Sequence, residues 1–249
     1  MRRRFFVDRF ERDSAVLHDE AAEHLGRVLR AEPGQLYELS DGEHVWLARV
    51  ERVAVSKRGP NQIDFALVEP IDVAQPSLRV SLFISIVKFD RFEWCLEKAT
   101  ELGADEITPL AAVRTDKPLL AAAARRHDRW QRILLESAQQ SRRLRQPELK
   151  AATKPADAFT RSSEALKIFL SERRDAEALR YVLRSRGNAT APQQSVALAI
   201  GPEGGWTDEE IAAGCANCFF EASLGKNILR TETAVIAALA ILQFALQKD

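Results

Sequence analysis

The sequence predicts an α/β protein in which a larger domain with a mainly parallel sheet follows a small, mostly β module. From Leu78 onward, short apolar runs alternate with helical patterns, which is typical of parallel strands joined by crossover helices. Before that residue, strand-like runs are joined by turn signals such as the Asp-Gly pair at 41–42. The stretch 69–76 carries two prolines, which interrupt strands and helices. We therefore expect two domains, 1–72 and 73–249.

The N-terminal module is expected to hold three strands and one helix. Strands are predicted at 35–40 and 43–53, on either side of the Asp-Gly turn, and at 62–68, after a turn signal at 58–61. Asp19 can cap the helix, because a carboxylate at this position accepts a hydrogen bond from the first turn. The apolar face of this helix would comprise Ala22, Leu25, Val28 and Leu29.

The C-terminal domain is expected to alternate strands with helices throughout. The predicted strands occupy residues 78–87, 106–110, 166–170, 196–200 and 219–222. The predicted helices run from Asp90 to Gly103, over 121–144 and 175–186, from Thr207, and from about Thr233 onward. Residues 234–242 are apolar on all sides of the last helix, so this helix must be covered on more than one side. A sheet and a second subunit would cover it, and so would burial within a single chain.

The composition is that of a soluble globular protein, because 46% of the 249 residues are hydrophobic, 29% are charged and the net charge is zero. The apolar stretch 234–246 is too short for a bilayer, which requires about 20 apolar residues. No apolar segment follows the basic start of the chain. We therefore expect a cytoplasmic protein with no membrane partner.

No metal site is expected. Cys215 and Cys218 form the one close pair among three cysteines, and neither a second cysteine pair nor a histidine pair stands nearby to complete a tetrahedral site.

The charges are distributed unevenly along the chain: residues 77–195 contain 22 lysines and arginines against 15 acidic residues. This excess fits either contacts with nucleic-acid phosphates or a solvated helix face.

Two loops near the C-terminus carry the candidate chemistry. The first, 201–206, contains three glycines, which permit a ligand to approach the backbone closely. The second is 224–234, which offers Arg230, Glu232 and two threonines beside apolar Ile228 and Leu229, and each loop follows a predicted buried strand. Because the ends of parallel strands meet at one edge of a sheet, the two loops would line one crevice. Carboxylates crowd the helix start at 207–210 and no phosphate-binding glycine motif is present, which favours a nucleoside ligand without phosphates.

Ordered motifs along nearly the whole chain indicate a family. Beside the two loops, they are Arg4-Phe5-Phe6-Val7, residues 24–30, Lys88 with Asp90-Arg91, residues 98–103, Arg129-Trp130, and residues 138–142 ahead of Pro147. The loops resemble the cofactor loops of the SPOUT class of S-adenosylmethionine (SAM) methyltransferases. The whole chain more closely resembles the bacterial RsmE-type family, which methylates N3 of a uridine in 16S ribosomal RNA of the small ribosomal subunit.

The resemblance implies a PUA-like β-barrel domain that binds RNA, followed by a SPOUT α/β domain with a trefoil knot, in a homodimer. It also implies a set of residues that bind SAM: Leu170, Ile200, Gly201, Pro202, Glu203, Gly205, Leu224, Gly225, Ile228, Leu229 and Arg230. Glu203 would either position the ribose hydroxyls or pin its loop.

Six cations are the candidates for contact with RNA: Arg3, Arg4, Arg27, Arg30, Arg142 and Arg143. Arg27 and Arg30 are three residues apart and would share a helix face, from which they could grip successive phosphates. A solvated face remains the alternative for this pair.

Uridine N3 becomes nucleophilic when it loses its proton, and a cation beside the flanking carbonyl oxygens stabilises the resulting anion. Arg230 is the candidate for that cation and Glu232 is the candidate for the proton acceptor. In an alternative version, Arg230 holds the RNA phosphate beside the target base and solvent receives the proton. Trp206 would either stack on the extruded base or pack in the core.

Two other functions fit part of the sequence. A SPOUT methyltransferase that acts on transfer RNA or on a ribose hydroxyl would share the cofactor loops, but it would lack the motifs at 4–7 and 24–30. A non-catalytic RNA-binding or ribosome-assembly protein would keep the fold with a decayed pocket. The intact loops at 201–205 and 229–233 argue against such decay.

Overall fold

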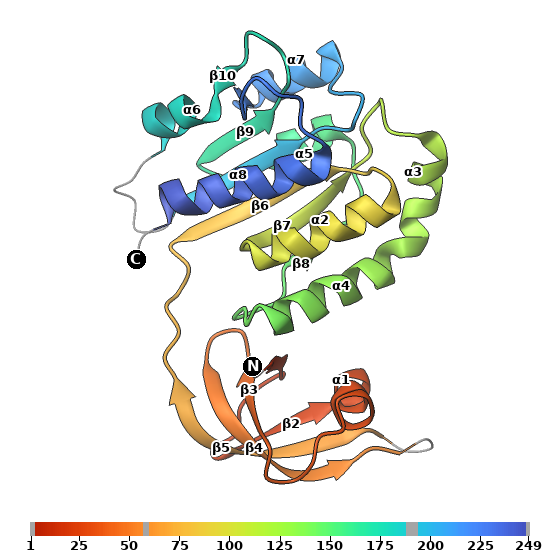
Figure 1. The fold of residues 1–249 in the computed structure, drawn as a ribbon, viewed down its shortest axis with the longest axis vertical. Helices are drawn as coiled ribbons and strands as arrows, with labels where there is room; N and C mark the ends of the chain where they lie inside the picture. Colours follow the sequence, from red (N-terminus) through yellow and green to blue (C-terminus); the bar gives the residue numbers. More distant parts are fainter. Residues whose placement is uncertain (1–2, 57–59, 188–193, 248–249) are drawn as a thin grey trace. The chain divides into compact units, whose positions relative to one another are not determined.

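The structure is a computed structural model that describes residues 3–56, 60–187 and 194–247; the predicted turn at 58–61 lies partly outside them. The chain divides into two compact units (Figure 1): residues 1–75 with 138–146, and residues 76–137 with 147–249. The N-terminal unit thus includes a segment from the middle of the chain, residues 138–146, which we name the crossing segment. No pattern in the sequence predicted it.

Five strands form the sheet of the N-terminal unit, in the order β1-β3-β4-β5-β2. They are β1 (Arg4–Phe6), β2 (Ser14–His18), β3 (Leu36–Ser40), β4 (Val45–Ala54) and β5 (Gln62–Ile71). β1 lies parallel to β3, and the other pairs are antiparallel. The pairing of β4 with β5 shifts register twice, which bends the sheet around a core that includes Phe5, Leu39 and Phe65. The three predicted strands are confirmed, and β1 and β2 are additional.

The helix predicted after Asp19 differs from its expected form. α1 covers Asp19–Glu23 and continues into one π-helical turn, His24–Val28. Asp19 does not cap this helix: His18 occupies the N-cap position, and Asp19 itself has a φ of 51°. The expectation of one regular helix with an Asp19 cap was therefore wrong.

The π-helical turn also changes which side chains are buried. Val28 is 65% exposed, so it does not belong to the buried face that the period of 3.6 predicted. Gly26 lies against the end of β4, where a Cβ atom would come within 2.7 Å of Cγ2 of Val55. The close approach of this turn to the sheet therefore requires glycine.

The helix predicted over 121–144 consists of three shorter elements. These are α3 (Lys117–Ala123), a 3-10 turn (Ala124–Arg126) and α4 (His127–Gln140). The helical run stops at Gln140 because Arg142, two residues later, adopts a φ of 55°, in the left-handed region. Instead of continuing the helix, the carbonyl oxygens of Arg142 and Leu144 accept hydrogen bonds from Arg4 and Ser40, within the N-terminal unit.

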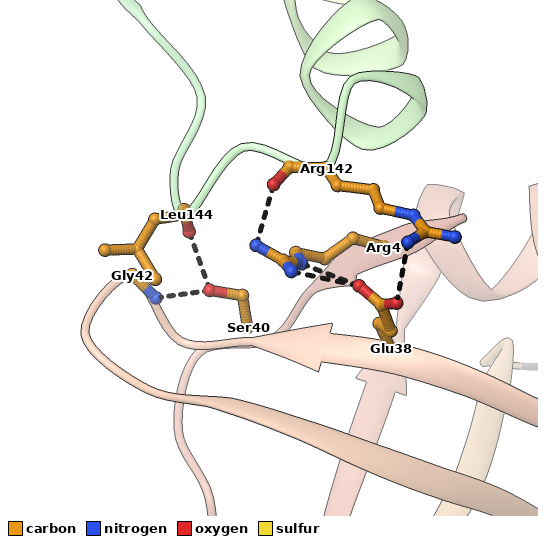
Figure 2. A network of polar contacts seen from close by, with 6 residues as sticks. All are labelled: Arg4, Glu38, Ser40, Gly42, Arg142 and Leu144. Carbon is orange, nitrogen blue, oxygen red and sulfur yellow. Dashed lines mark hydrogen bonds and ion pairs between the residues drawn. The ribbon is translucent and has the colours of Figure 1, made fainter. Parts of the chain in front are cut away.

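A buried polar network holds the crossing segment in the N-terminal unit (Figure 2). Arg4 donates from Nε and Nη2 to Oε2 of Glu38 at 3.2 and 2.9 Å, and from Nη1 to the carbonyl oxygen of Arg142 at 2.7 Å. Ser40 donates its hydroxyl to the carbonyl oxygen of Leu144 at 2.6 Å. Nη1 of Arg142 lies 3.5 Å from the other carboxylate oxygen of Glu38. Arg4 is only 4% exposed, so this guanidinium is a structural link.

Seven strands form the sheet of the C-terminal unit, in the order β10-β12-β9-β11-β6-β7-β8. They are β6 (Leu78–Ser85), β7 (Ala104–Leu110), β8 (Glu148–Leu149), β9 (Leu166–Leu170), β10 (Glu177–Ala178), β11 (Gln194–Ile200) and β12 (Phe220–Ser223). The described pairings in this sheet are parallel. The five predicted strands are confirmed, and the two-residue edge strands β8 and β10 are additional.

Helices cover both faces of this sheet because successive side chains of its strands point to opposite faces, and the side chains on both faces are apolar. Leu82 and Ile84 of β6 belong to the cluster that also buries α2 (Phe89–Glu101) and α8 (Thr231–Leu246). Phe83 of the same strand belongs to the opposite cluster, beneath α5 (Pro155–Arg161) and α7 (Asp208–Ala216). α6 (Leu179–Arg186) starts later than the predicted 175, because β10 precedes it.

Within the described ranges, no helix has the length and apolar character needed to cross a membrane.

Replacing Arg4 with alanine should destabilise the N-terminal unit. The change leaves the carboxylate of Glu38 buried beside a single, more distant cation, and loss of one partner of a buried pair costs about 3–5 kcal/mol. Urea unfolding of the full chain measures this loss. Arg9→Ala is the matched control, because it breaks only the exposed Arg9–Glu11 pair and should leave the unfolding midpoint unchanged. Equal midpoints for the two variants would contradict a structural role for Arg4.

Candidate functional site: a cavity between two loops

A cavity of about 470 Å³ lies at the carboxyl ends of three adjacent strands, β9, β11 and β12. Leu170 at the end of β9 is in register with Ile200 at the end of β11 and with Ala222 near the end of β12. The loops that follow these strands therefore emerge side by side. A ligand crevice is expected at this position of an open parallel sheet.

The first loop, 201–206, is fixed by its own backbone and by Trp206. Gly205 has a φ of 70° and donates its N–H to the carbonyl oxygen of Pro202 at 2.8 Å, which closes a tight turn. The indole N–H of Trp206 donates to the carbonyl oxygen of Leu170 at 2.8 Å. A Cβ atom on Gly201 would lie 3.0 Å from the indole ring, so glycine lets the loop pass over it.

Trp206 is 7% exposed and makes edge contacts with the rings of Phe159 and Phe169. Of the two roles considered for this residue, the structure favours core packing. Its indole ring forms the floor of the first loop.

The first loop leads into α7 through a capping box. Thr207 accepts a hydrogen bond on Oγ1 from the backbone N–H of Glu210 at 3.2 Å, and Oε2 of Glu210 accepts from the N–H of Thr207 at 2.9 Å. The other carboxylate oxygen of Glu210 accepts from the N–H of Val113 at 2.9 Å. The buried Glu210 thus joins the start of α7 to the chain that follows β7.

The second loop is shorter than predicted: it covers 224–230, because α8 already begins at Thr231, and it presents apolar side chains to the cavity. Ile228 and Leu229 are exposed, and Leu224 packs partly against the core. Gly225 has a φ of 140°, a conformation that other residues rarely adopt. Thr231, the first residue of α8, places its hydroxyl 3.4 Å from the carbonyl oxygen of Gly201. This contact brings the two loops together at the back of the cavity.

The structure brings together the residues that were predicted to bind SAM, with one exception. Those lining the cavity are Leu170, Ile200, Gly201, Pro202, Glu203, Gly205, Leu224, Gly225, Ile228 and Leu229. Arg230 is not among the lining residues; it is exposed at the N-cap position of α8. Their assignment as ligands stays a prediction, but their convergence on one cavity is an observation.

Glu232 lies apart from the cavity. Its side chain is 13% exposed and turns toward α2, where its Oε1 is 3.9 Å from Nε of Arg91. Its Oε2 is buried and has no hydrogen-bond partner among the described residues. Burial, and then the charge of Glu232, raise the pKa of the neighbouring Cys95 thiol to about 12, so this thiol is protonated at neutral pH.

Several polar residues of the cavity were missed by the sequence analysis. Glu172 and Arg173 come directly after β9, and Arg114 follows β7; all three line the cavity. Nη1 of Arg114 donates to the carbonyl oxygen of Gly204 at 2.8 Å and so supports the first loop. A signal was present, because each residue follows the carboxyl end of a predicted strand.

The six cations predicted to contact RNA all belong to the N-terminal unit, since the crossing segment contributes Arg142 and Arg143. Burial of Arg4 and its contacts to Glu38 and Arg142 do not support the prediction that it contacts RNA. Arg3 and Arg30 are exposed.

Arg27 forms an ion pair with Glu23 at the end of α1. Arg27 and Arg30 do not share a helix face, because the π-helical turn ends at Val28 and Arg30 has a φ of 53°.

In the described part of the chain, no group of three or more His, Cys, Asp or Glu side chains could hold a metal ion. Cys215 and Cys218 are free and exposed near the end of α7.

Comparison with known proteins agrees with a parallel α/β domain whose ligand cavity is built by strand-end loops. A family of RNA methyltransferase domains matches residues 74–243. Ribosomal RNA small subunit methyltransferase E from a Synechocystis strain is 36% identical over 220 residues, which cover 87% of this chain and 68% of that protein. The corresponding protein from Mesomycoplasma hyopneumoniae is 32% identical and covers 72% and 76% of the two chains.

Solved structures match over the full length. A ribosomal RNA small subunit methyltransferase E from Neisseria gonorrhoeae, bound to S-adenosyl methionine, has a TM-score of 0.82 at 29% identity and covers 99% of both chains. A methyltransferase from Legionella pneumophila with bound SAM has a TM-score of 0.81 at 30% identity and covers 100% of both chains.

The match to the RNA methyltransferase domain over residues 74–243 and the fold identify an RNA methyltransferase of the SPOUT class. More closely, the chain belongs to the family of ribosomal RNA small subunit methyltransferases E. The fold class expected from the sequence, a SPOUT α/β knot domain after a small PUA-like β-barrel domain, is confirmed.

Replacing Glu210 with alanine should destabilise the start of α7, directly after the first loop. The change removes the capping box and leaves the N–H of Val113 without its acceptor, which together should lower the free energy of unfolding by about 2 kcal/mol. Thermal unfolding measures this effect. Glu209→Ala, in the same helical turn but exposed, should cause a much smaller change. A similar loss in both variants would mean that Glu210 acts only through its charge at the helix start.

Proposed function

We propose that this chain is an enzyme that transfers a methyl group from SAM to N3 of a uridine in 16S ribosomal RNA of the small ribosomal subunit. The observation that carries the cofactor part of the proposal is the convergence of ten predicted SAM-binding residues from three strand ends on one cavity, and the RNA part is supported by relatives named ribosomal RNA small subunit methyltransferase E. Their separation in sequence makes a chance gathering improbable. The proposal places the protein in the cytoplasm, where bacterial ribosomal subunits are found.

The residues of the cavity fit a nucleoside cofactor. Its volume of about 470 Å³ lies within the roughly 300–1,000 Å³ range of small-molecule sites. Leu170, Ile200, Leu224 and Leu229 supply apolar walls, while the glycine-containing loops leave backbone groups accessible. The N-terminus of α7 is occupied by its own carboxylates, which disfavours a phosphate at that end.

SAM supplies an activated methyl group when it is bound, so the protein has to orient the two reactants and manage the uridine proton. The placement of Glu232 against α2 disfavours it as the proton acceptor and supports the version in which solvent receives the proton. Arg230 is exposed directly after the second loop, which supports a contact to the RNA phosphate beside the target base. Arg114, which lines the cavity, is a second candidate for the cation that stabilises the uridine anion.

The N-terminal unit is proposed to bind RNA, within the PUA-like domain expected at residues 1–72. Exposed Arg3, Arg27 and Arg30, with Arg142 and Arg143 of the crossing segment, supply its cations. Such contacts fix the position of a protein on RNA without reading its sequence. Selection of the uridine would then depend on the shape of the folded RNA.

The outer side of α8 supports the proposal of a homodimer. Val235, Ala238 and Leu242 are buried against the C-terminal unit, whereas Phe244 on the same helix is 93% exposed. Ile241 and Ala240 extend this exposed apolar stripe. The described residues of a single chain do not cover it, which favours the second subunit over burial within one chain.

Transfer of labelled methyl from SAM to small subunits that lack this modification tests the proposed function. After digestion to nucleosides, the label should appear as 3-methyluridine, and subunits that already carry the modification should accept none. Label in a 2′-O-methyl nucleoside would assign the enzyme to the ribose-methylating alternative. Absence of both transfer and calorimetric SAM binding would support the non-catalytic alternative.

Phe244→Glu should weaken the proposed dimer. A charge on the apolar stripe of α8 would be desolvated in the interface without a partner, so the dissociation constant of the dimer should rise by about tenfold or more. Analytical ultracentrifugation measures the dimer population. Tyr181→Glu is the matched control, because Tyr181 is an exposed aromatic residue on α6. If both variants associate as the unaltered chain does, α8 is not the interface.

A further inference from the structure

Arg91, in the first turn of α2, lies between the two loops of the cavity. Its Nη1 donates to Oε1 of Glu203 in the first loop. Its Nε is 3.9 Å from Oε1 of Glu232, in the first turn of α8 and so directly after the second loop. One guanidinium, carried by a helix that contributes no lining residue to the cavity, therefore contacts a carboxylate at each loop.

The charges at this point require a cation. Glu203 and Glu232 approach the same side chain, and two carboxylates close to one another repel in a partly buried site. Glu232 is the more buried of the two, and its Oε2 has no hydrogen-bond partner in the described structure. A buried carboxylate without compensation is costly, so the guanidinium lowers the free energy of the arrangement in which both loops are close.

Arginine suits this position better than lysine. Its planar guanidinium presents separate N–H groups in fixed directions, so Nη1 and Nε can face different carboxylates at once. The backbone of α2 is rigid at this point, because Phe92 and Cys95 on its inner face are fully buried. Arg91 thus anchors both loops to a rigid helix of the core, and such anchoring is the condition for a preorganised site.

We propose that Arg91 is a positioning residue that clamps the two loops and holds the cavity at the width that the cofactor requires. The inference rests on the proposed function. Of the two roles considered for Glu203, it assigns the pinning of the loop. The hydroxyl of Thr231 near the carbonyl oxygen of Gly201 is a second link between the same loops, but it is neutral and at 3.4 Å it is long. The hydrogen-bonded ion pair of Arg91 with Glu203 is the stronger end of the clamp, and the longer pair with Glu232 adds a charge attraction at the second loop.

Arg91→Ala in the full-length protein tests the clamp. The dissociation constant for SAM, measured by calorimetry, and the KM for SAM should both rise by about tenfold or more, because the lining groups are no longer held in place. The kcat at saturating SAM should change by less than about threefold, because Arg91 does not line the cavity and bound cofactor restores the loop arrangement. A residue that acted directly on the reacting atoms would lower kcat instead.

Arg129→Ala is the matched control. Arg129, on α4, donates two hydrogen bonds of 2.8 Å to Glu93, which lies on α2 as Arg91 does. Arg129 touches neither loop. Its loss removes an ion pair of α2 and should leave SAM affinity unchanged.

Glu203→Gln keeps the test decisive if Arg91→Ala does not fold. Glu203 is exposed at the loop, so the variant should remain folded while it weakens one end of the clamp. Unchanged SAM affinity in the folded Arg91 and Glu203 variants, or an equal loss in Arg129→Ala, would overturn the inference while the unaltered protein still binds SAM. Failure of the unaltered protein to bind SAM would instead overturn the proposed function.

Discussion

The parallel pairing of β12, β9 and β11 is the constraint on which the site depends. Parallel strands all point the same way, so their register brings Leu170, Ile200 and Ala222 to one edge. The loops that follow these three strands then line the same cavity. The cavity is therefore a consequence of how the sheet is assembled, and the loops only determine what it can hold.

Several contacts of different kinds keep the loops in place. The indole of Trp206 bonds to the end of β9, Glu210 ties α7 to the chain after β7, and Arg114 supports the carbonyl of Gly204. Each of these contacts joins a side chain to a backbone group. The proposed clamp at Arg91 adds a charged contact from the opposite face of the sheet, where α2 lies. Cofactor binding through backbone groups would require support of this kind.

The N-terminal unit depends on a contact between residues that are distant in sequence. It completes its structure with a segment from the middle of the chain, and a buried guanidinium makes the connection. The place of Arg4 in a basic, motif-bearing stretch predicts a contact with RNA. Its partner Glu38 lies 34 residues away in sequence, so no local pattern could have revealed the pairing. The same network explains why the helix predicted to reach 144 ends at Gln140.

From the sequence we could predict the α/β class with a mainly parallel sheet, the strands other than β1, β2, β8 and β10, and the residues of the two loops. These follow from apolar periodicity and from glycine, proline and capping residues, which act over a few positions. Tertiary structure alone decided that Trp206 packs in the core, that Glu232 faces α2 and that Arg114 enters the site. It also decided the π-helical turn at Gly26, which depends on the distance to Val55. The physical reason is the same in each case: the direction of a side chain depends on neighbours that are distant in sequence, and only the packed chain brings them into contact.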